Sequence, residues 1–308
     1  MDRKKLIIVL GAGGMGAAYA SRLYDSGNDE IAFIASGERY LRLKTGGVMI
    51  NGKHYQIPVL SPEDPGPSAD LVIVALKHQH LQSALPLLQN FVGEETVFVS
   101  IMNGLDSEPM IASVYGEEKI LYATAVGIDA QRTENVVNYS KGGTIFFGEA
   151  DNSLLSQRVK EVQAIFDRAG IPYQTPTDMV RIMWWKFMIN VGINQASAIL
   201  RAPYGVFQSS PHAQQIMESA MREVLLLAAP NGVNLVEADI QDWYAFLNTL
   251  DPDGKTSMLQ DIEAGRKTEV EIFGGKVLEM GKETGIRTPV NEILFHAIKV
   301  IEDQGKAR

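Results

Sequence analysis

The stretch LIIVLGAGGMG, residues 6–16, decides the fold. Its first five residues, Leu6–Leu10, form a continuous apolar run of strand length, which is typical of a central parallel strand covered on both faces. Glycines with the spacing GxGxxG follow, and then a helical stretch that ends near Ser26-Gly27. Strand, glycine turn and helix in this order are the context in which the motif binds a dinucleotide. The alternative is a tight structural turn.

Each glycine of the turn has an expected task. The first makes the turn, the second lets a pyrophosphate approach the backbone, and the third packs the helix against the strand. We therefore predict that the turn contacts a dinucleotide through Gly11, Gly13, Gly14, Met15 and Gly16.

The residues after the second expected strand, Ile31–Ala35, carry a mixed signal about the cofactor. In this architecture an acid at that place bonds the ribose 2′-hydroxyl of NAD, whereas a basic group favours the 2′-phosphate of NADP. Ser36 and Arg39 could bind a phosphate, and Glu38 would oppose it unless it points away. We predict NADP, with Ser36 and Arg39 as cofactor contacts; the alternative for Arg39 is an ordinary cation on a helix surface.

Two further polar residues follow expected strands. Lys77 comes after Leu71–Leu76, and Asn103 comes after Thr96–Ile101. Ligands bind at the carboxyl ends of the strands in open α/β sheets, so Lys77 is predicted to contact the cofactor, and Asn103 the cofactor or the substrate. The alternatives are a solvated lysine at a strand end and an Asn-Gly turn.

Residues 1–174 are predicted to form an α/β, Rossmann-type dinucleotide-binding domain. Asn51-Gly52 lies between short alternating runs and predicts a hairpin. A helix is expected at Leu154–Ala169, and the further strands are expected at Ile120–Val126, Asn135–Tyr139, Thr144–Phe147 and Ile171–Tyr173, with the second and third of these paired in antiparallel fashion.

Residues 175–308 show no convincing strand period and are predicted to form an all-α domain. Thr175 is expected to be the N-cap of its first helix, with Pro176 at the first helical position and Asp178 in the first turn. Later helices are expected at Gln214–Ala229, Glu237–Leu250 and Asn291–Gln304. An α/β domain followed by a helical domain predicts a cleft at their junction.

The first of these helices contains an unusual polar stripe. Lys186, Asn190 and Asn194 are four residues apart within the otherwise apolar stretch Trp184–Leu200. Steps of four residues keep side chains on one face of a helix. Polar groups buried without partners cost roughly 1–3 kcal/mol each, so the stripe is either a satisfied structural network or a site.

Composition limits the classes of partner. The chain has 308 residues, 45% of them hydrophobic, no cysteine, a net charge of −9 and a pI of about 5.2. The acidic balance argues against nucleic acid, and no apolar run approaches the roughly 20 residues that a membrane span needs. The five histidines are not grouped as metal ligands, so no metal is predicted. We expect a soluble cytoplasmic protein that could form a homodimer.

Taken together, several motifs resemble the ketopantoate reductase (2-dehydropantoate 2-reductase) family along nearly the whole chain. They are the GAGGMG turn, W-x-K-x-x-x-N-x-x-x-N at residues 184–194, S-M-L-Q-D at 257–261, Thr268-Glu269, and T-P-V-N at 288–291. The glycine motif is shared by many dehydrogenases, and the other motifs are more specific.

The resemblance implies an α/β Rossmann-type domain followed by an all-α domain like the C-terminal domain of 6-phosphogluconate dehydrogenase. It implies reduction by NADPH of a small 2-keto acid, ketopantoate, to pantoate. By matching positions it implies that Lys186 is the general acid, Glu269 an active-site carboxylate, and Asn190, Asn194 and Ser257 substrate contacts. Asn103 and Lys77 match the family's cofactor-side positions. One departure concerns the cofactor: the family commonly has an arginine near position 36, where this chain has Ser36.

Ser257 and Glu269 can serve one small substrate only if the chain bends between them. On one unbroken helix, residues twelve apart would be separated by about 18 Å. Gly265 is a plausible helix end, and Thr268 with Glu271 forms a capping box that would start a new helix. We therefore predict a break between Gly265 and Thr268.

Two alternative functions are consistent with the sequence. The chain could reduce a different 2-keto acid with the same two-domain architecture, or it could be a dinucleotide-binding sensor that no longer catalyses. The joint presence of Lys186, Asn190, Asn194, Ser257 and Glu269 favours an enzyme.

Overall fold

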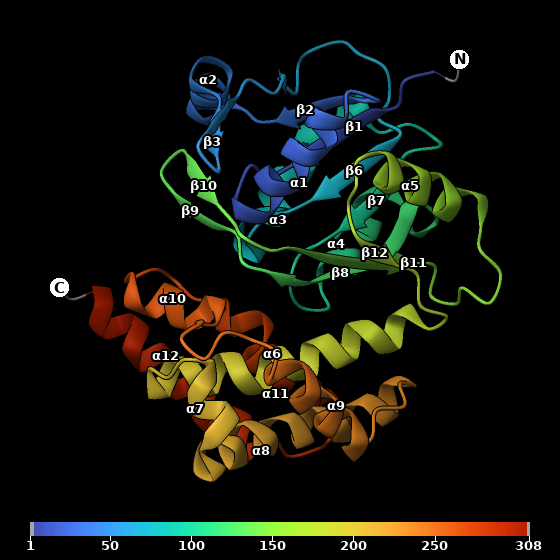
Figure 1. The fold of residues 1–308 in the computed structure, drawn as a ribbon. Helices are drawn as coiled ribbons and strands as arrows, with labels where there is room; N and C mark the ends of the chain where they lie inside the picture. Colours follow the sequence, from blue (N-terminus) through green and yellow to red (C-terminus); the bar gives the residue numbers. More distant parts are fainter. Residues whose placement is uncertain (1–2, 307–308) are drawn as a thin grey trace. The chain divides into compact units, whose positions relative to one another are not determined.

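The computed structural model describes residues 3–306 (Figure 1). Contacts divide the chain into two compact units, one ending at Met179 and the other beginning at Val180. Among the described residues, no helix is both long and apolar enough to cross a membrane.

Strand β1 (Leu6–Leu10) lies inside the main sheet of the first unit, and all five of its residues are buried. It pairs in parallel with β2 (Glu30–Ile34) on one side and β6 (Leu71–Val74) on the other. Within residues 3–306 the sheet has eight strands in the order β12-β11-β8-β7-β6-β1-β2-β5. The remaining strands are β5 (Val59–Leu60), β7 (Val97–Ser100), β8 (Ile120–Ile128), β11 (Gly142–Gly148) and β12 (Tyr173–Gln174).

Helices cover both faces of this sheet, which explains why its strands are continuously apolar. One face packs against α1 (Gly14–Ser26) and α5 (Gln157–Arg168), and the other against α3 (Leu81–Ala84), η2 (Leu85–Phe91) and α4 (Ser107–Tyr115) (Figure 1). The short helices η1 (His78–His80) and η3 (Glu117–Lys119) and helix α2 (Gly37–Gly46) complete the unit. The predicted α/β architecture is thus confirmed.

A second, smaller sheet has the order β4-β3-β10-β9, with strands β3 (Val48–Ile50), β4 (Lys53–Tyr55), β9 (Gln131–Thr133) and β10 (Val136–Asn138). The predicted hairpin at Asn51-Gly52 joins β3 to β4, with φ angles of 47° and 77° at the two turn residues. Both angles are positive, as a two-residue hairpin of this kind requires.

The predicted antiparallel pairing of residues 135–139 with residues 144–147 is wrong. β10 pairs instead with β9 and, in parallel, with β3. β11 pairs along its length with β8. The reason is a tight turn at Glu134, whose φ of 54° lets β10 fold back on β9, a strand that the polar sequence Gln131–Thr133 did not signal.

The predicted helix start at Thr175 is also wrong, because α6 begins at Met179. Residues 175–178 are extended, and their backbone pairs with residues 150–152. Asn152 donates from its backbone N–H to the Thr177 carbonyl (2.7 Å) and from its side chain to the Pro176 carbonyl (2.8 Å). These carbonyl groups therefore accept hydrogen bonds from Asn152 instead of from N–H groups within a helix.

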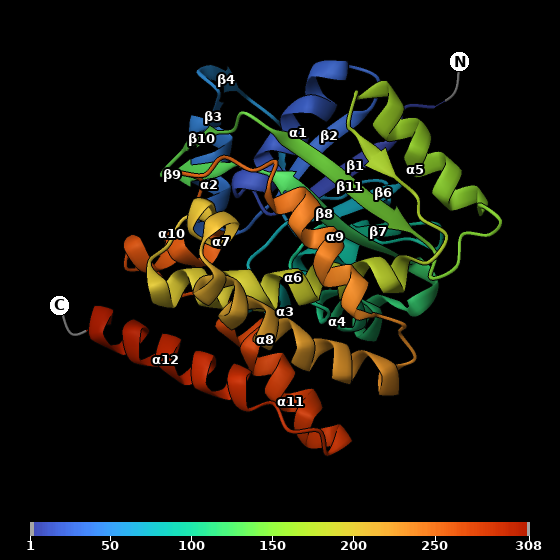
Figure 2. The ribbon, with the colours of Figure 1, turned by 60° about the horizontal axis from the view of Figure 1, so that its bottom comes forward.

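The second unit is helical, as predicted. Its longest helix is α6 (Met179–Leu200), which packs so closely on α8 that a Cβ at Gly192 would lie 2.9 Å from the Met217 carbonyl oxygen. Helices α8, α11 and α12 pack against one another (Figure 2). The elements after α6 are α7 (Tyr204–Ser209), α8 (Pro211–Ala228), η4 (Ala229–Asn231), α9 (Glu237–Leu247), α10 (Ser257–Glu263), η5 (Val270–Ile272), α11 (Gly274–Thr284) and α12 (Pro289–Lys306).

The T-P-V-N motif at residues 288–291 has a structural task in this unit. The carboxylate of Glu223, on α8, accepts from the backbone N–H groups of Val290 (2.8 Å) and Asn291 (2.9 Å) and from the Asn291 side chain (2.7 Å). These are the unpaired donors of the first turn of α12, so Glu223 satisfies them and anchors that end of the helix.

The predicted break after residue 265 is confirmed. Helix α10 ends at Glu263, and Gly265 has the left-handed φ of 63°. The predicted capping box of Thr268 and Glu271 is wrong, however. Glu271 pairs with Lys299, and the Thr268 N–H donates to Glu302 instead. The chain after the break forms only the 3₁₀ turn η5 before α11 begins at Gly274.

Candidate active site

In the first unit, four of the predicted contact regions follow parallel neighbouring strands. The glycine turn follows β1, Ser36 follows β2, Lys77 follows β6 and Asn103 follows β7. These strands run in the same direction, so the four regions share the carboxyl edge of the sheet. From β1 the chain continues to β2 on one side of it, and the later strand β6 lies on the other side of β1. The carboxyl end of β1 is therefore the topological switch point, where α/β sheets bind ligands.

The glycines of the turn differ in whether packing and backbone conformation exclude a side chain at their position. A Cβ at Gly16 would lie 1.9 Å from the Gly11 carbonyl oxygen, and one at Gly11, whose φ is 115°, would lie 2.5 Å from the Ala75 carbonyl oxygen. Both glycines are therefore required by packing. Gly13 has an ordinary φ of −75°, and a Cβ there would meet nothing closer than the Ala75 oxygen at 3.8 Å. Neither packing nor backbone conformation explains Gly13, whereas a ligand held close to the backbone does.

The start of α1 fits a bound anion. Gly13 is its N-cap and provides no side-chain cap, and the first turn contains no acidic residue. The first N–H groups of a helix and its dipole attract a phosphate at such an end. Met15 is partly buried and packs against the core of this unit. These observations fit a dinucleotide pyrophosphate.

The end of β2 presents two of the predicted contacts. Ser36 is exposed and is the N-cap residue of α2, but its hydroxyl makes no capping hydrogen bond. Burial, and then the neighbouring charge of Arg42, lower the pKa of Arg39. Glu38 is not among the charges that affect the pKa of Arg39.

Arg132, on β9, lies close to the same arginines and was missed by the sequence analysis. Burial, followed by the charges of Arg39 and Arg42, lower its pKa. Its guanidinium donates to the Ala12 carbonyl within the glycine turn and to the Glu134 carbonyl (2.6 Å). Three guanidinium groups therefore gather beside the turn, an arrangement that favours an anion.

Arg132 could not be found from the sequence because it lies 120 residues from Ala12 and its strand was not predicted. The same segment approaches the turn at a second point, since a Cβ at Gly14 would lie 2.7 Å from the Ala130 carbonyl oxygen. Residues 130–132 thus lie directly against the turn.

Lys77 and Asn103 lie in the loops after their strands and are both partly buried. Beside Asn103, the Ser100 hydroxyl donates to Ser107 (2.8 Å), and the Ser107 hydroxyl donates to the buried carboxylate of Glu108 (2.8 Å). Burial raises the pKa of Glu108 to about 7. His78 is partly buried and His80 is exposed, both in η1 after β6, and no group of side chains that could hold a metal ion occurs within residues 3–306.

In the second unit, the predicted polar stripe lies on one unbroken helix. Lys186, Asn190 and Asn194 all fall within α6, and the two asparagines are only 5% exposed each. Trp184 and Phe187 beside Lys186 pack edge to face, with ring centroids 6.1 Å apart. The two asparagines of the stripe are therefore buried, and Lys186 is partly buried beside aromatic side chains.

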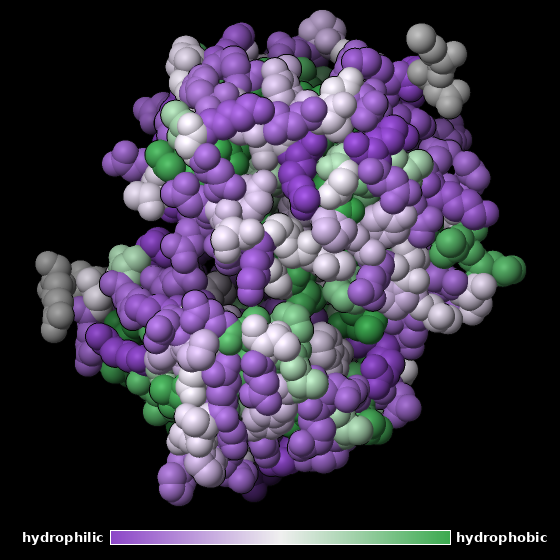
Figure 3. All heavy atoms as spheres, in the orientation of Figure 1, coloured by the Kyte–Doolittle hydropathy of each residue, from purple (hydrophilic) through white to green (hydrophobic). Residues whose placement is uncertain are grey.

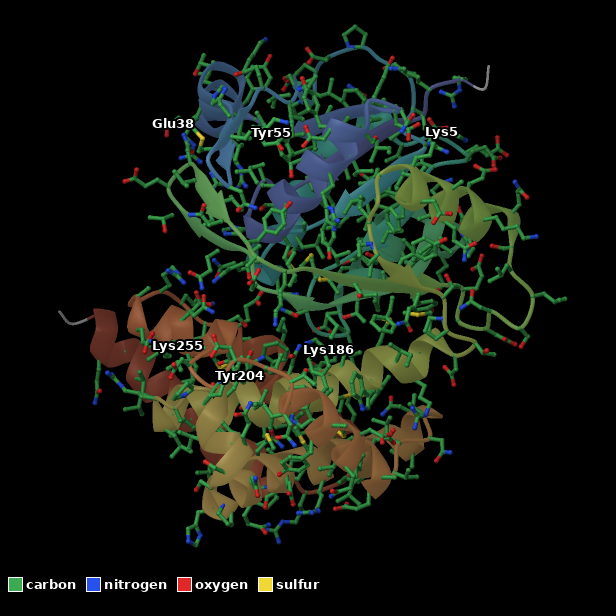
Figure 4. All side chains as sticks on the ribbon, in the orientation of Figure 1. Lys5, Glu38, Tyr55, Lys186, Tyr204 and Lys255 are labelled. Carbon is green, nitrogen blue, oxygen red and sulfur yellow. The ribbon has the colours of Figure 1, made fainter. Side chains whose placement is uncertain are left out.

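Lys186 projects from α6 without a hydrogen bond or an ion pair to any described residue (Figure 4). Burial lowers the pKa of its ammonium to about 8, and no carboxylate counteracts that effect. Glu269 is therefore not among the groups that affect the pKa of Lys186. A lysine with a pKa near neutrality can give up its proton readily, as a general acid must.

Asn194 is only 5% exposed, and its side-chain amide makes no hydrogen bond within the described part of the chain. The amide is therefore available to hydrogen-bond a ligand. The Ser197 hydroxyl, one turn further along α6, donates to the Asn194 carbonyl (3.3 Å) and lies 2.5 Å from the Thr256 hydroxyl.

That contact connects α6 to the start of α10. Thr256 is the N-cap of α10 and accepts from the Leu259 N–H (3.2 Å), which leaves Ser257 as the exposed first residue of the helix. The loop before it packs on Tyr204 of α7, which donates its backbone N–H to the Gly254 carbonyl (2.9 Å). The structure thus brings the neighbourhood of Ser257 to the far end of the polar stripe.

Glu269 is partly buried and precedes the 3₁₀ turn η5 as its N-cap. Five residues later, Gly274 packs on α6, where a Cβ would lie 2.3 Å from the Gln195 side-chain oxygen. The starts of α10 and α11 therefore both lie against the Asn194–Ser197 part of α6.

A parallel sheet with a glycine turn at its switch point, followed by a helical unit with a buried lysine, defines a dinucleotide-dependent oxidoreductase. Comparison with protein families makes the assignment specific. The family described as ketopantoate reductase PanE/ApbA matches residues 7–152, and its C-terminal part matches residues 178–302. The chain belongs to the ketopantoate reductase family.

Individual relatives agree with this assignment. A 2-dehydropantoate 2-reductase of Pyrococcus horikoshii is 27% identical, with 97% of this chain and 98% of the relative covered. The structure of a 2-dehydropantoate 2-reductase from Geobacter metallireducens is 27% identical with a TM-score of 0.83, covering 96% and 99% of the two chains. A D-mandelate dehydrogenase, solved with NADH and anilino(oxo)acetate, has a TM-score of 0.87 at 22% identity and coverages of 98% and 99%, which shows a shared fold.

The two kinds of glycine in the turn predict opposite effects of an added methyl group. Gly13→Ala should leave the free energy of unfolding unchanged or slightly higher but weaken dinucleotide binding by roughly tenfold or more, about 1.4 kcal/mol. Gly16→Ala should destabilise the fold by roughly 1–3 kcal/mol, because backbone must shift. Denaturant unfolding and titration with NADPH and NADH measure both effects. Tight dinucleotide binding by Gly13→Ala would contradict the ligand explanation for Gly13.

Proposed function

We propose that this chain reduces the C2 ketone of ketopantoate to the hydroxyl of pantoate, using NADPH. Family membership supports the reaction class, and the substrate that names the relatives supports ketopantoate. The observation that carries the proposal is the partly buried Lys186, whose ammonium has no partner within residues 3–306 and which shares a stripe of α6 with Asn190 and Asn194.

The bound nicotinamide would supply hydride to the ketone carbon. As that bond forms, negative charge develops on the ketone oxygen, and the Lys186 ammonium is the group proposed to stabilise this charge and donate the proton. A pKa of about 8 suits the task, because the lysine is mostly protonated at neutral pH and loses its proton at little cost.

The neutral polar groups are proposed to orient the keto acid. Asn190, Asn194 and Ser257 can hold the carboxylate and carbonyl oxygens through N–H and O–H donors without adding charge. Asn103 is proposed to contact the substrate or the nicotinamide, and Lys77 the cofactor. Glu269 is proposed as the active-site carboxylate that binds a hydroxyl of the substrate.

The preference for NADPH rests on the arginine cluster at the end of β2. Burial and the charge of Arg42 lower the pKa of Arg39, burial and the charges of Arg39 and Arg42 lower the pKa of Arg132, and no carboxylate is among the charges that affect either group. A 2′-phosphate beside Ser36 would relieve this repulsion and gain charge-assisted hydrogen bonds. Arg42 and Arg132 would thereby take over the task of the arginine that the family commonly has near position 36.

A second candidate function is reduction of a bulkier 2-keto acid, as the D-mandelate dehydrogenase with the same fold suggests. The homodimer expected from the sequence stays a prediction, as does the cytoplasmic location.

A substrate panel tests the reaction directly. We expect NADPH oxidation with ketopantoate to have a kcat/KM at least roughly tenfold above those for a straight-chain and an aromatic 2-keto acid, a margin of about 1.4 kcal/mol in transition-state binding. Equal or better turnover of the aromatic acid would favour the second candidate. Cofactor binding without turnover of any keto acid would indicate a sensor.

Replacing the proposed proton donor separates catalysis from folding. Lys186→Met should lower kcat by roughly 10²–10⁴-fold with little change in NADPH affinity. It should also raise the free energy of unfolding at pH 7, since a buried ammonium whose pKa is depressed destabilises the fold below that pKa. Lys282→Met, at an exposed position of α11, is the control. Turnover at the wild-type level would exclude Lys186 as the acid.

The same lysine predicts a pH dependence. Because the protonated form is the active one and its pKa is about 8, kcat/KM for keto acid reduction should be constant below pH 8 and fall above it. The measurement is a pH profile at fixed ionic strength. A profile that rises through pH 8 would contradict the assigned role.

The arginine cluster predicts which cofactor loses affinity. Arg132→Met should raise the KM for NADPH by roughly 5- to 50-fold, or about 1–2.3 kcal/mol, and change the KM for NADH by less than about threefold. Arg132→Lys, which keeps the charge, should recover part of the loss, and the exposed Arg287→Met should behave as wild type. Equal losses for both cofactors would show that Arg132 serves the fold of the turn rather than recognition of the 2′-phosphate.

A further inference from the structure

The segment that carries Glu269 is held from one side by α12. The Glu302 side chain, which is 3% exposed, accepts at Oε1 from the Thr268 backbone N–H (2.8 Å) and from the Thr268 hydroxyl (2.6 Å). Thr268 immediately precedes Glu269. A buried carboxylate on a long helix thus fixes both the backbone and the side chain of the neighbouring residue.

Lys299 holds the other flank of Glu269. Its ammonium donates to Glu302 Oε2 (2.5 Å) and to Glu271 Oε1 (2.9 Å). Lys299 and Glu302 are three residues apart on α12 and therefore share a face of that helix. A single pair of α12 side chains consequently fixes residues 268 and 271, on either side of Glu269.

All three groups remain charged despite their partial burial. Burial is the largest effect on the pKa of Glu302 and of Glu271 and raises it, but their hydrogen bonds and the neighbouring lysine charges together outweigh burial, and the net pKa of each is lowered. Burial lowers the pKa of Lys299, and its bonds with the two carboxylates outweigh that effect. The network is therefore ionised at neutral pH, where its hydrogen bonds are strongest.

Helix capping alone does not account for the network. A capping box would need only Thr268 and Glu271, which have the required spacing of three residues. Instead, Glu271 forms an ion pair with Lys299, and the Thr268 N–H donates to Glu302. The elements that follow are a three-residue 3₁₀ turn and then α11. The contacts of Thr268 and Glu271 with α12 therefore do not serve to start a long helix at this point. They determine where residue 269 lies.

We propose that Glu302 and Lys299 are positioning residues that set the place of the Glu269 carboxylate in the active site. This inference rests on the proposed function, in which Glu269 binds the substrate. Misplacing a group that contacts the substrate by about 1 Å can lower the rate by roughly 100-fold. The network prevents such a shift.

The test uses four single variants of the full chain. Glu302→Ala removes both bonds to Thr268 and should lower kcat/KM for ketopantoate by roughly 10- to 100-fold, with the KM for NADPH within about twofold. Glu302→Gln keeps an oxygen that can accept from Thr268 and should recover most of the loss, whereas Lys299→Met should lose roughly 3- to 10-fold. Glu292→Ala, at an exposed position of the same helix, is the matched control and should behave as wild type.

A double-mutant comparison separates positioning from a general effect on folding. If Glu302 acts through Glu269, Glu302→Ala should change kcat/KM by less than about twofold in a Glu269→Gln background. Hydrogen exchange of the peptide spanning residues 264–273 should be faster in Glu302→Ala and unchanged in Glu292→Ala. If Glu302→Ala does not fold, Lys299→Met takes its place in both measurements.

The outcomes are distinguishable. The same fractional loss in both backgrounds, or unchanged exchange in the peptide, would overturn the positioning role while leaving the proposed function intact. The positioning role would also be overturned, with the proposed function intact, if Glu302→Ala and Lys299→Met kept full turnover while Glu269→Gln lost turnover. Full turnover by Glu269→Gln would overturn both this inference and the role of Glu269 in the proposed function.

Discussion

Helix α1 can lie against strand β1 only because residue 16 has no side chain. A Cβ there would come within 1.9 Å of the Gly11 carbonyl oxygen, far closer than a nonbonded carbon and oxygen can approach. This one contact places the amino end of α1 at the carboxyl edge of the sheet, beside the ends of β2, β6 and β7. The face of the first unit seen in Figure 3 is mostly hydrophilic.

The parts that sequence predicted well are those determined by local pattern. Strand β1, the hairpin at Asn51-Gly52 and the break at Gly265 each depend on neighbouring residues, whose conformational preferences are visible in the chain. The stripe of Lys186, Asn190 and Asn194 is likewise a helical spacing, and α6 is an unbroken helix through it. Local physics therefore accounts for the fold class and for the polar face of α6.

The parts that sequence did not predict depend on distant partners. Arg132 contacts Ala12 only because β10 pairs with β3, and the capping of Thr268 passes from Glu271 to Glu302, 34 residues away. Helix α6 begins later than predicted for the same reason. Asn152 donates to the carbonyl groups that a helix starting at Thr175 would have needed. In each case a local preference of about 1 kcal/mol gave way to a long-range hydrogen bond that no spacing rule reveals.

Helix α12 is anchored at both ends, by Glu223 at its first turn and by Thr268 and Glu271 near its last. It is also synthesised after every residue of the candidate site. A nascent chain would therefore contain the glycine turn, the α6 stripe and Glu269 while residues 268–271 still lacked their fixed position. Domains tend to fold in the order in which they emerge from the ribosome, so the dinucleotide-binding unit could form before the second unit is complete. Ordering of the Glu269 segment would then be a late step of maturation, limited by arrival of the closing helix.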